Sequence, residues 1–198
     1  MFDGSGSWGA GVEAASWFRE WLASNQQNSE FVSPASVNNA LQNGKNLLPQ
    51  NLIDDDVFGW SFSVVVAIVD DTSIQIGRCG AFAAVAVSRS LGDKLFAPTT
   101  LGDELAAAGN FAESDEQASK YSKIICSSFF GDGNEDQLIW TTPIKNLKGV
   151  KIVIGHATLP RFLTSCEGQV FLTDPETIRD HVEKFSGQSS PTAIISNP

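Results

Sequence analysis

Asp3 opens the stretch of this chain whose residue types and spacing are best suited to chemistry. It is followed by Gly4 and by further glycines at positions 6, 9 and 11. Glycines at this spacing let the backbone turn sharply and bring bare carbonyl and N–H groups close to a ligand or a metal ion. The residues alone leave two interpretations open, a binding turn or a flexible glycine-rich N-terminus, because a single glycine-rich run is a weak motif.

Two helices should follow this stretch. Residues 9 to about 24 carry apolar side chains at helical spacing, which predicts an amphipathic helix whose tryptophans, Trp17 and Trp21, lie in the core. Ser33 followed by Pro34 is typical of a helix start, so a second helix is expected from there to about residue 48.

The period then changes to that of β-strands. Residues 61–69 are apolar and largely β-branched, Asp70 and Asp71 should form a turn, and residues 73–77 should return as the second strand of a hairpin. Residues 81–88 predict a further strand, and residues 91–94 should turn into a short strand at 95–96. We expect these strands to form one antiparallel meander.

The rest of the chain alternates between short helices and strands. Thr100 should cap a helix that ends at Gly109, and a second short helix is expected at about 114–121. Strands are predicted at 124–129, 137–140 and 150–154, a helix at about 174–185 and a last strand at 192–196. This order predicts an α+β layered domain, and the absence of repeats and linkers predicts that residues 1–198 form a single domain.

Charge and composition narrow the function classes. The chain has 13 Lys and Arg against 23 Asp and Glu, a net charge of −10 that repels nucleic-acid phosphates and anionic lipid. No apolar run approaches the roughly 18 residues that a membrane span needs. Cys79, Cys126 and Cys166 are far apart and are expected to be reduced thiols. We therefore expect a cytoplasmic protein that binds neither nucleic acid nor membranes.

Across nearly its whole length the chain resembles the metal-dependent (type 2C, PPM) serine/threonine protein phosphatases. Asp3 and Gly4 match the opening of that family's Asp-Gly-x-Gly-Gly turn, and Gly77-Arg78-Cys79-Gly80 stands where the family has Gly-Asp-Ser-Arg. Residues 59–69, 149–154 and 190–195 resemble further family segments, the last two being the strand before its Ser-Asp-Gly motif and its final Asp-Asn-x-Thr strand.

This resemblance implies a fold and a metal site. The fold would be a sandwich of two antiparallel β-sheets flanked by α-helices. In the family, the Asp of the first motif bridges two divalent metals and the Gly lends a backbone carbonyl, so Asp3 and Gly4 are the expected metal ligands, with Mg²⁺ or Mn²⁺ as the metal if any binds.

The motifs that would complete the metal site depart from the family pattern. His156-Ala157-Thr158 stands in place of Ser-Asp-Gly and Ser190-Pro191 in place of Asp-Asn, so carboxylates are missing at Ala157 and Ser190. A site for two divalent ions needs several carboxylates to neutralise their charge. The family's first strands, with an Arg that receives the substrate phosphate, also have no counterpart, so the chain looks N-terminally short.

These departures predict a catalytically impaired phosphatase domain that binds a partner, such as a phosphoprotein or another signalling protein. An active Mg²⁺- or Mn²⁺-dependent serine/threonine phosphatase that hydrolyses phosphoprotein monoesters is the alternative. A third reading is an α+β interaction domain outside the family.

Four other residues carry side chains that could take part in chemistry. A shifted alignment would recruit Glu167 as a ligand, and Asp115 stands where some bacterial members place an acidic residue for a third metal. Cys166 and His156 could form a nucleophile pair. The plainer interpretations are a helix-start charge for Asp115 and a polar residue at a strand end for His156.

Overall fold

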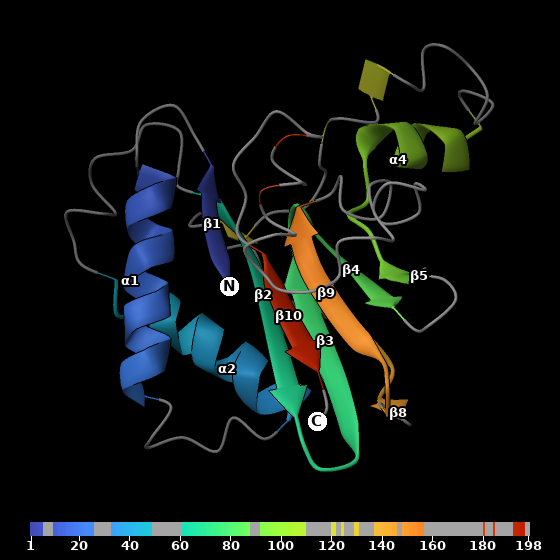
Figure 1. Cartoon of the computed structure of the whole chain (residues 1–198). Coiled ribbons are helices and arrows are strands. Elements are labelled where there is room, and N and C mark those ends of the chain that lie inside the picture. The colour runs from blue at the N-terminus through green and yellow to red at the C-terminus, as the bar shows by residue number, and fades with distance from the viewer. Residues whose placement is uncertain are drawn as a thin grey trace.

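A computed structural model gives the structure of the chain (Figure 1). It describes residues 1–5, 10–25, 33–48, 61–87, 92–109, 120–121, 124, 129–130, 137–145, 148–156, 180, 184 and 192–196. Within these ranges the strands form two separate antiparallel sheets.

The first sheet is built around the hairpin of β2 (Ser61–Val69) and β3 (Ser73–Cys79). β1 (Phe2–Ser5) pairs with the edge of β2 that faces away from β3. Three strands of two residues each complete this sheet. β6 (Phe129–Phe130) pairs with β2, and β7 (Ile139–Trp140) and β8 (Ile144–Lys145) pair with β3.

The second sheet has the order β10, β9, β4, β5. These strands are β4 (Phe82–Val87), β5 (Gly92–Phe96), β9 (Lys151–His156) and β10 (Ala193–Ser196), and every pair is antiparallel. Two segments distant in the sequence therefore meet in this sheet, since β9 lies between β4 and the C-terminal β10. His156 is the last residue of β9, as its interpretation as a strand-end residue predicted.

A core of apolar side chains from both sheets joins them into a sandwich. Alternate residues of β2 and β3 point to the second sheet, because successive side chains of a strand lie on opposite faces. The buried members of this core are Val65, Ile74, Ile76, Phe82, Ala84, Ile152 and Ile154. The predicted α+β sandwich of two antiparallel sheets is confirmed.

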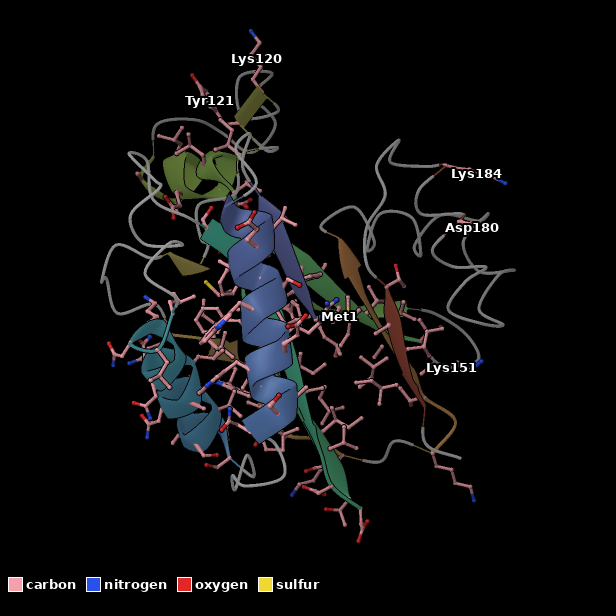
Figure 2. The ribbon with its side chains drawn as sticks, turned by 90° about the vertical axis from the view of Figure 1, so that its left-hand side faces the viewer. Met1, Lys120, Tyr121, Lys151, Asp180 and Lys184 are labelled. Carbon is pink, nitrogen blue, oxygen red and sulfur yellow. The ribbon has the colours of Figure 1, made fainter. Side chains whose placement is uncertain are left out.

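α1 (Ala10–Asn25) and α2 (Pro34–Lys45) cover the other face of the first sheet (Figure 2). Phe18 of α1 is fully buried, and its ring centroid lies 5.0 Å from that of Phe62 in β2. Phe2 of β1 joins the same cluster, 5.6 Å from Phe62. Trp17 and Trp21, the two tryptophans predicted to lie in the core, are only half-buried.

Helix starts and the first turn follow their local signals. Ser33 caps α2, and Thr100 caps α4 (Leu101–Ala107), each through a reciprocal pair of hydrogen bonds with the residue three positions later. Asp70 closes the β2–β3 turn: its carboxylate accepts hydrogen bonds from the backbone N–H groups of Thr72 and Ser73, both at 2.7 Å. The Ser73 hydroxyl, which donates a hydrogen bond of 2.7 Å to Asp70 Oδ2, is the main cause that lowers the pKa of Asp70, and the bonds from the backbone N–H groups add to it.

The prediction that the strands form a single antiparallel meander is wrong, because β3 and β4 belong to different sheets. The chain leaves the first sheet at Gly80, whose φ of +94° is a conformation that favours glycine. Ser63 fixes this exit, since its hydroxyl oxygen accepts a hydrogen bond of 2.9 Å from the N–H of Ala81.

One further expectation needs correction and another is only partly tested. Phe2–Ser5 is a strand paired with β2, whereas residues 6–9 of the predicted glycine-rich turn lie outside the described residues. The predicted turn at 91–94 is largely strand, since β5 begins at Gly92 and pairs with β4.

Several other predicted elements fall mostly outside the described residues. Lys120 and Tyr121 are helical, as are Asp180 and Lys184, within the helices expected at about 114–121 and 174–185. Of the predicted strand 124–129, only its end lies in β6. None of the helices that the structure describes has the length and apolar composition needed to cross a lipid bilayer.

Candidate functional site

β1 places Asp3 and Gly4 at the edge of the first sheet, where Asp3 lies opposite Ser63 and Gly4 opposite Phe62. Met1 and Val65 exchange both of their backbone hydrogen bonds. Such pairs alternate with pairs that exchange none, so the N–H and C=O of Gly4 point away from β2. The carbonyl of Gly4 is thus directed out of the ladder, where it could serve as a ligand.

Gly4 is also a point of close contact between β1 and α1. A Cβ atom at this position would overlap the backbone of Gly11 and the Cα of Val12. Packing therefore requires glycine at position 4, independently of any metal.

The described residues do not supply the ligands of a two-metal site. Among the side chains that the structure describes, no three of the types His, Cys, Asp and Glu gather in one place. Ala157 and Ser190, where carboxylates are missing from the sequence, lie outside the described residues, as do Glu167, Cys166 and Asp115. For Asp3 the structure describes the backbone only. One carboxylate together with one backbone carbonyl does not neutralise the charge of two divalent ions.

Arg78 is a buried cation in the layer between the two sheets. It alternates with Ile74 and Ile76 on the inner face of β3 and is only 8% exposed. Its guanidinium carbon lies 5.2 Å from the centre of the Phe96 ring, which belongs to β5 of the opposite sheet. The nitrogen Nη1 is buried and has no hydrogen-bond partner among the described residues.

Burial lowers the pKa of Arg78, because the surroundings solvate its charge poorly. In the sequence, Arg78 departs from the Gly-Asp-Ser-Arg pattern of the family, and that departure alone indicates no role for it. The inward side of the 73–79 strand, which reads Ile74, Ile76, Arg78, was the available signal for this buried charge.

Replacing Arg78 with methionine should raise the free energy of unfolding by about 1 to 2 kcal/mol, because an apolar chain of similar length removes a buried charge that has no ionic partner among the described residues. Urea unfolding measures the change. Arg19→Met is the matched control: its side chain is 67% exposed, and it should change stability by less than about 0.5 kcal/mol. A loss of stability in Arg78→Met would contradict the prediction and mean that the guanidinium has a stabilising partner.

Comparison with solved structures identifies the architecture. A serine/threonine phosphatase of S. agalactiae superposes with a TM-score of 0.74 at 17% identity, over 99% of this chain and 86% of that one. The chain has the fold of the PPM phosphatases. The catalytic domain of PstP, solved in complex with two manganese ions, gives 0.71 at 15% identity, over 98% and 84%. The PPM phosphatase MsPP of Mycobacterium smegmatis gives 0.66 at 16%, over 100% and 86%.

The resemblance seen in the sequence is thereby confirmed for the fold. No protein-family model and no curated protein sequence matches the chain. Within this PPM phosphatase fold, Cys79 is a buried, reduced cysteine, as expected, while Cys126 and Cys166 lie outside the described residues.

Proposed function

We propose that this chain is a PPM-fold domain with impaired catalysis that acts by binding a partner. The observation that carries the proposal is the exchange at Arg78, where a buried guanidinium stands in the place of the Asp of Gly-Asp-Ser-Arg. Asp3 lies opposite Ser63 of β2, and Arg78 of β3 lies opposite Val65, two residues further along β2. With the usual spacings between strands and between residues, the Cα atoms of Asp3 and Arg78 are about 12 Å apart. A fixed positive charge at this range opposes the binding of divalent cations.

The missing carboxylates at Ala157 and Ser190 support the same proposal, because without them the expected metal ligands are reduced to Asp3 and Gly4 of the first motif. Any Mg²⁺ or Mn²⁺ would be held weakly there. A cytoplasmic location and a phosphoprotein or other signalling protein as partner are parts of the proposal that come from composition and from the fold.

The test is calorimetry with Mn²⁺ on the wild type and Asp3→Ala, run beside hydrolysis of p-nitrophenyl phosphate. We expect no binding heat that depends on Asp3, and the same background hydrolysis in both proteins. Tight binding that disappears in Asp3→Ala, together with turnover by the wild type, would overturn the proposal in favour of an active metal-dependent phosphatase.

A restored variant serves as the positive control. Ala157→Asp combined with Ser190→Asp returns carboxylates to the two positions where the motif comparison finds them missing. We expect this variant to bind Mn²⁺ more tightly than the wild type, because additional oxygen ligands offset the charge of the ion. Circular dichroism and urea unfolding establish that the restored variant is folded.

A further inference from the structure

Arg78 is the one charged side chain that is buried among the described residues. A guanidinium stays protonated over the whole range of pH in which proteins are folded, so its positive charge is permanent. Nη1 has no hydrogen-bond partner in the described part of the chain, and no described carboxylate forms an ion pair with Arg78. Because a buried charge without a counter-charge is costly, this guanidinium gains from an incoming anion.

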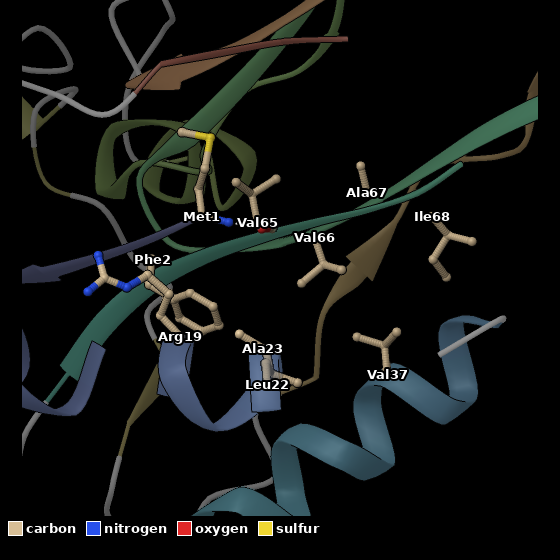
Figure 3. Close-up of a pocket in the computed structure, with 10 residues that line it drawn as sticks. All are labelled: Met1, Phe2, Arg19, Leu22, Ala23, Val37, Val65, Val66, Ala67 and Ile68. Carbon is tan, nitrogen blue, oxygen red and sulfur yellow. Dashed lines mark hydrogen bonds between the residues drawn. The ribbon is translucent and has the colours of Figure 1, made fainter. Parts of the chain in front are cut away.

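Arg19 shows the ordinary situation of an arginine in this chain. It lies beside a cavity of about 310 Å³ whose lining comes mostly from α1 and β2 (Figure 3). Its side chain is 67% exposed, and its Nη2 lies 3.8 Å from Oε1 of Glu20. Water and this carboxylate offset the charge of Arg19, so a further anion would add little there.

A β-bulge places an aromatic ring over the buried guanidinium. β5 carries one extra residue, Leu95, where its register with β4 shifts between Ala84 and Val85. Such a bulge lets two successive side chains face the same way, and Leu95 and Phe96 both pack against the core between the sheets. The Phe96 ring covers one face of the guanidinium, which leaves the edge with Nη1 for a planar anion.

The layer between the sheets meets solvent close to this guanidinium. Ile139 of β7 lies directly opposite Arg78, and residues opposite each other in an antiparallel pair carry their side chains on the same face. Ile139 is nevertheless 59% exposed, so the inner face of the first sheet ends in solvent beside Arg78. Exposed side chains change rotamer within picoseconds to nanoseconds, so Ile139 leaves a small ligand a way to the guanidinium.

Charge and lining define the class of ligand. One guanidinium neutralises one negative charge, and no second described cation is buried here, so a dianionic phosphate would keep a charge in apolar surroundings. A carboxylate carries one charge, and its two oxygens match the forked geometry of a guanidinium. The neighbouring side chains of Leu95, Phe96 and Ile139 are apolar, so the rest of the ligand should be apolar too.

We propose that Arg78 binds the carboxylate of a small monocarboxylic acid with an apolar body, at the edge of the sandwich where β7 and β5 lie. The net charge of −10 disfavours an acidic segment of a protein as the source of the carboxylate, because the chain repels a partner with several negative charges. The inference does not depend on metal binding, so hydrolysis and Mn²⁺ calorimetry test the proposed function separately.

The probe is benzoate, with benzamide as its neutral match, added to the full ¹⁵N-labelled chain at constant ionic strength. NMR should show benzoate shifting the Arg78 side-chain signal and binding about tenfold more tightly than benzamide, as expected for charge-assisted hydrogen bonds. Equal affinities, or no binding of benzoate, would overturn the proposal. Tighter binding of phenyl phosphate than of benzoate would overturn it in favour of a dianion.

Two arginine variants locate the binding. Arg78→Met should weaken the binding of benzoate about tenfold or more, and it should remain folded because it removes a buried charge. Arg19→Met is the matched control and should bind benzoate as the wild type does, since Arg19 is exposed and already paired with Glu20. Equal binding by these two variants would contradict the proposed place.

A tethered carboxylate completes the test. In Ile139→Glu the new side chain lies opposite Arg78 and should occupy the guanidinium, raise the urea midpoint of unfolding and abolish binding of benzoate. Val69→Glu is the control, because Val69 is equally exposed but lies at the end of β2, and it should leave binding unchanged. Unchanged binding in Ile139→Glu would count against the site.

The source of the carboxylate is tested with a capped amino acid. N-acetyl-Glu-N-methylamide presents the same group as an acidic side chain of a partner protein would. We expect it to bind more weakly than benzoate, because its amides meet the apolar side chains of Leu95 and Phe96. Tighter binding than that of benzoate would identify a protein side chain as the occupant and overturn the proposal of a small acid.

Discussion

Gly4→Ala is expected to lower the free energy of unfolding by about 3 kcal/mol, because the added Cβ overlaps main-chain atoms of α1 that no side-chain rotation can relieve. β1 and α1 must then separate, which also disturbs the pairing of β1 with β2 and the contact of Phe2 with Phe62. Urea unfolding measures the loss, with far-UV circular dichroism to show that the variant still folds.

Gly109→Ala is the control for Gly4→Ala. Gly109 has a φ of +76° and nothing within 4 Å of an added Cβ, so this substitution introduces backbone strain without a clash and should cost about 1 kcal/mol. If both substitutions cost the same, the close approach of β1 and α1 is wrong. If the prediction holds, loss of metal binding in a Gly4 variant is no evidence that its carbonyl is a ligand.

The stability of the chain is expected to rise by about 2 to 3 kcal/mol between pH 6 and pH 8 through the Met1 amine alone. The pKa of this amine is about 6 in the folded chain, against 8.0 when it is free of burial. In this interval the unfolded state holds the proton that the folded state has released. Protonation of the amine therefore favours the unfolded state. The free energy of unfolding rises as the pH is raised from 6 to 8, reaches its full value above pH 8, and is lowest below pH 6.

Urea unfolding at several pH values, with wild type and N-terminally acetylated chain, isolates this effect. The acetylated chain keeps an N–H that can donate to Val65 but has no amine to titrate. The difference in stability between the two proteins should therefore change across this interval. A constant difference would show that Met1 is not buried as the structure has it.

Much of the fold could be predicted because its signals are local. The β2–β3 hairpin shows β-branched residues on both sides of Asp70, whose carboxylate closes the turn within three residues. The capping residues Ser33 and Thr100 likewise act on positions three residues away. The order of these elements resembles that of the PPM phosphatases, and the sandwich that this resemblance implies is confirmed by the solved structures.

The candidate site could be predicted only in part. Asp3 and Gly4 came from their motif, and their role as metal ligands stays a proposal. Arg78 was read as a break in a motif, since nothing near it in the chain shows that its guanidinium lies over Phe96 of the other sheet. Its burial depends on β4 and β5 packing across the sandwich, which no window of the sequence displays.

The sequence by itself determined the hairpin, the helix starts and the order of elements, because each depends on residues within a few positions of one another. Tertiary structure decided which sheet each strand joins and why Gly4 must be glycine. These features depend on distant pairs: Met1 bonds to Val65, 64 positions away, and Phe82 lies opposite His156. Packing and strand pairing choose such partners by shape and hydrogen bonding in space, which local patterns do not encode.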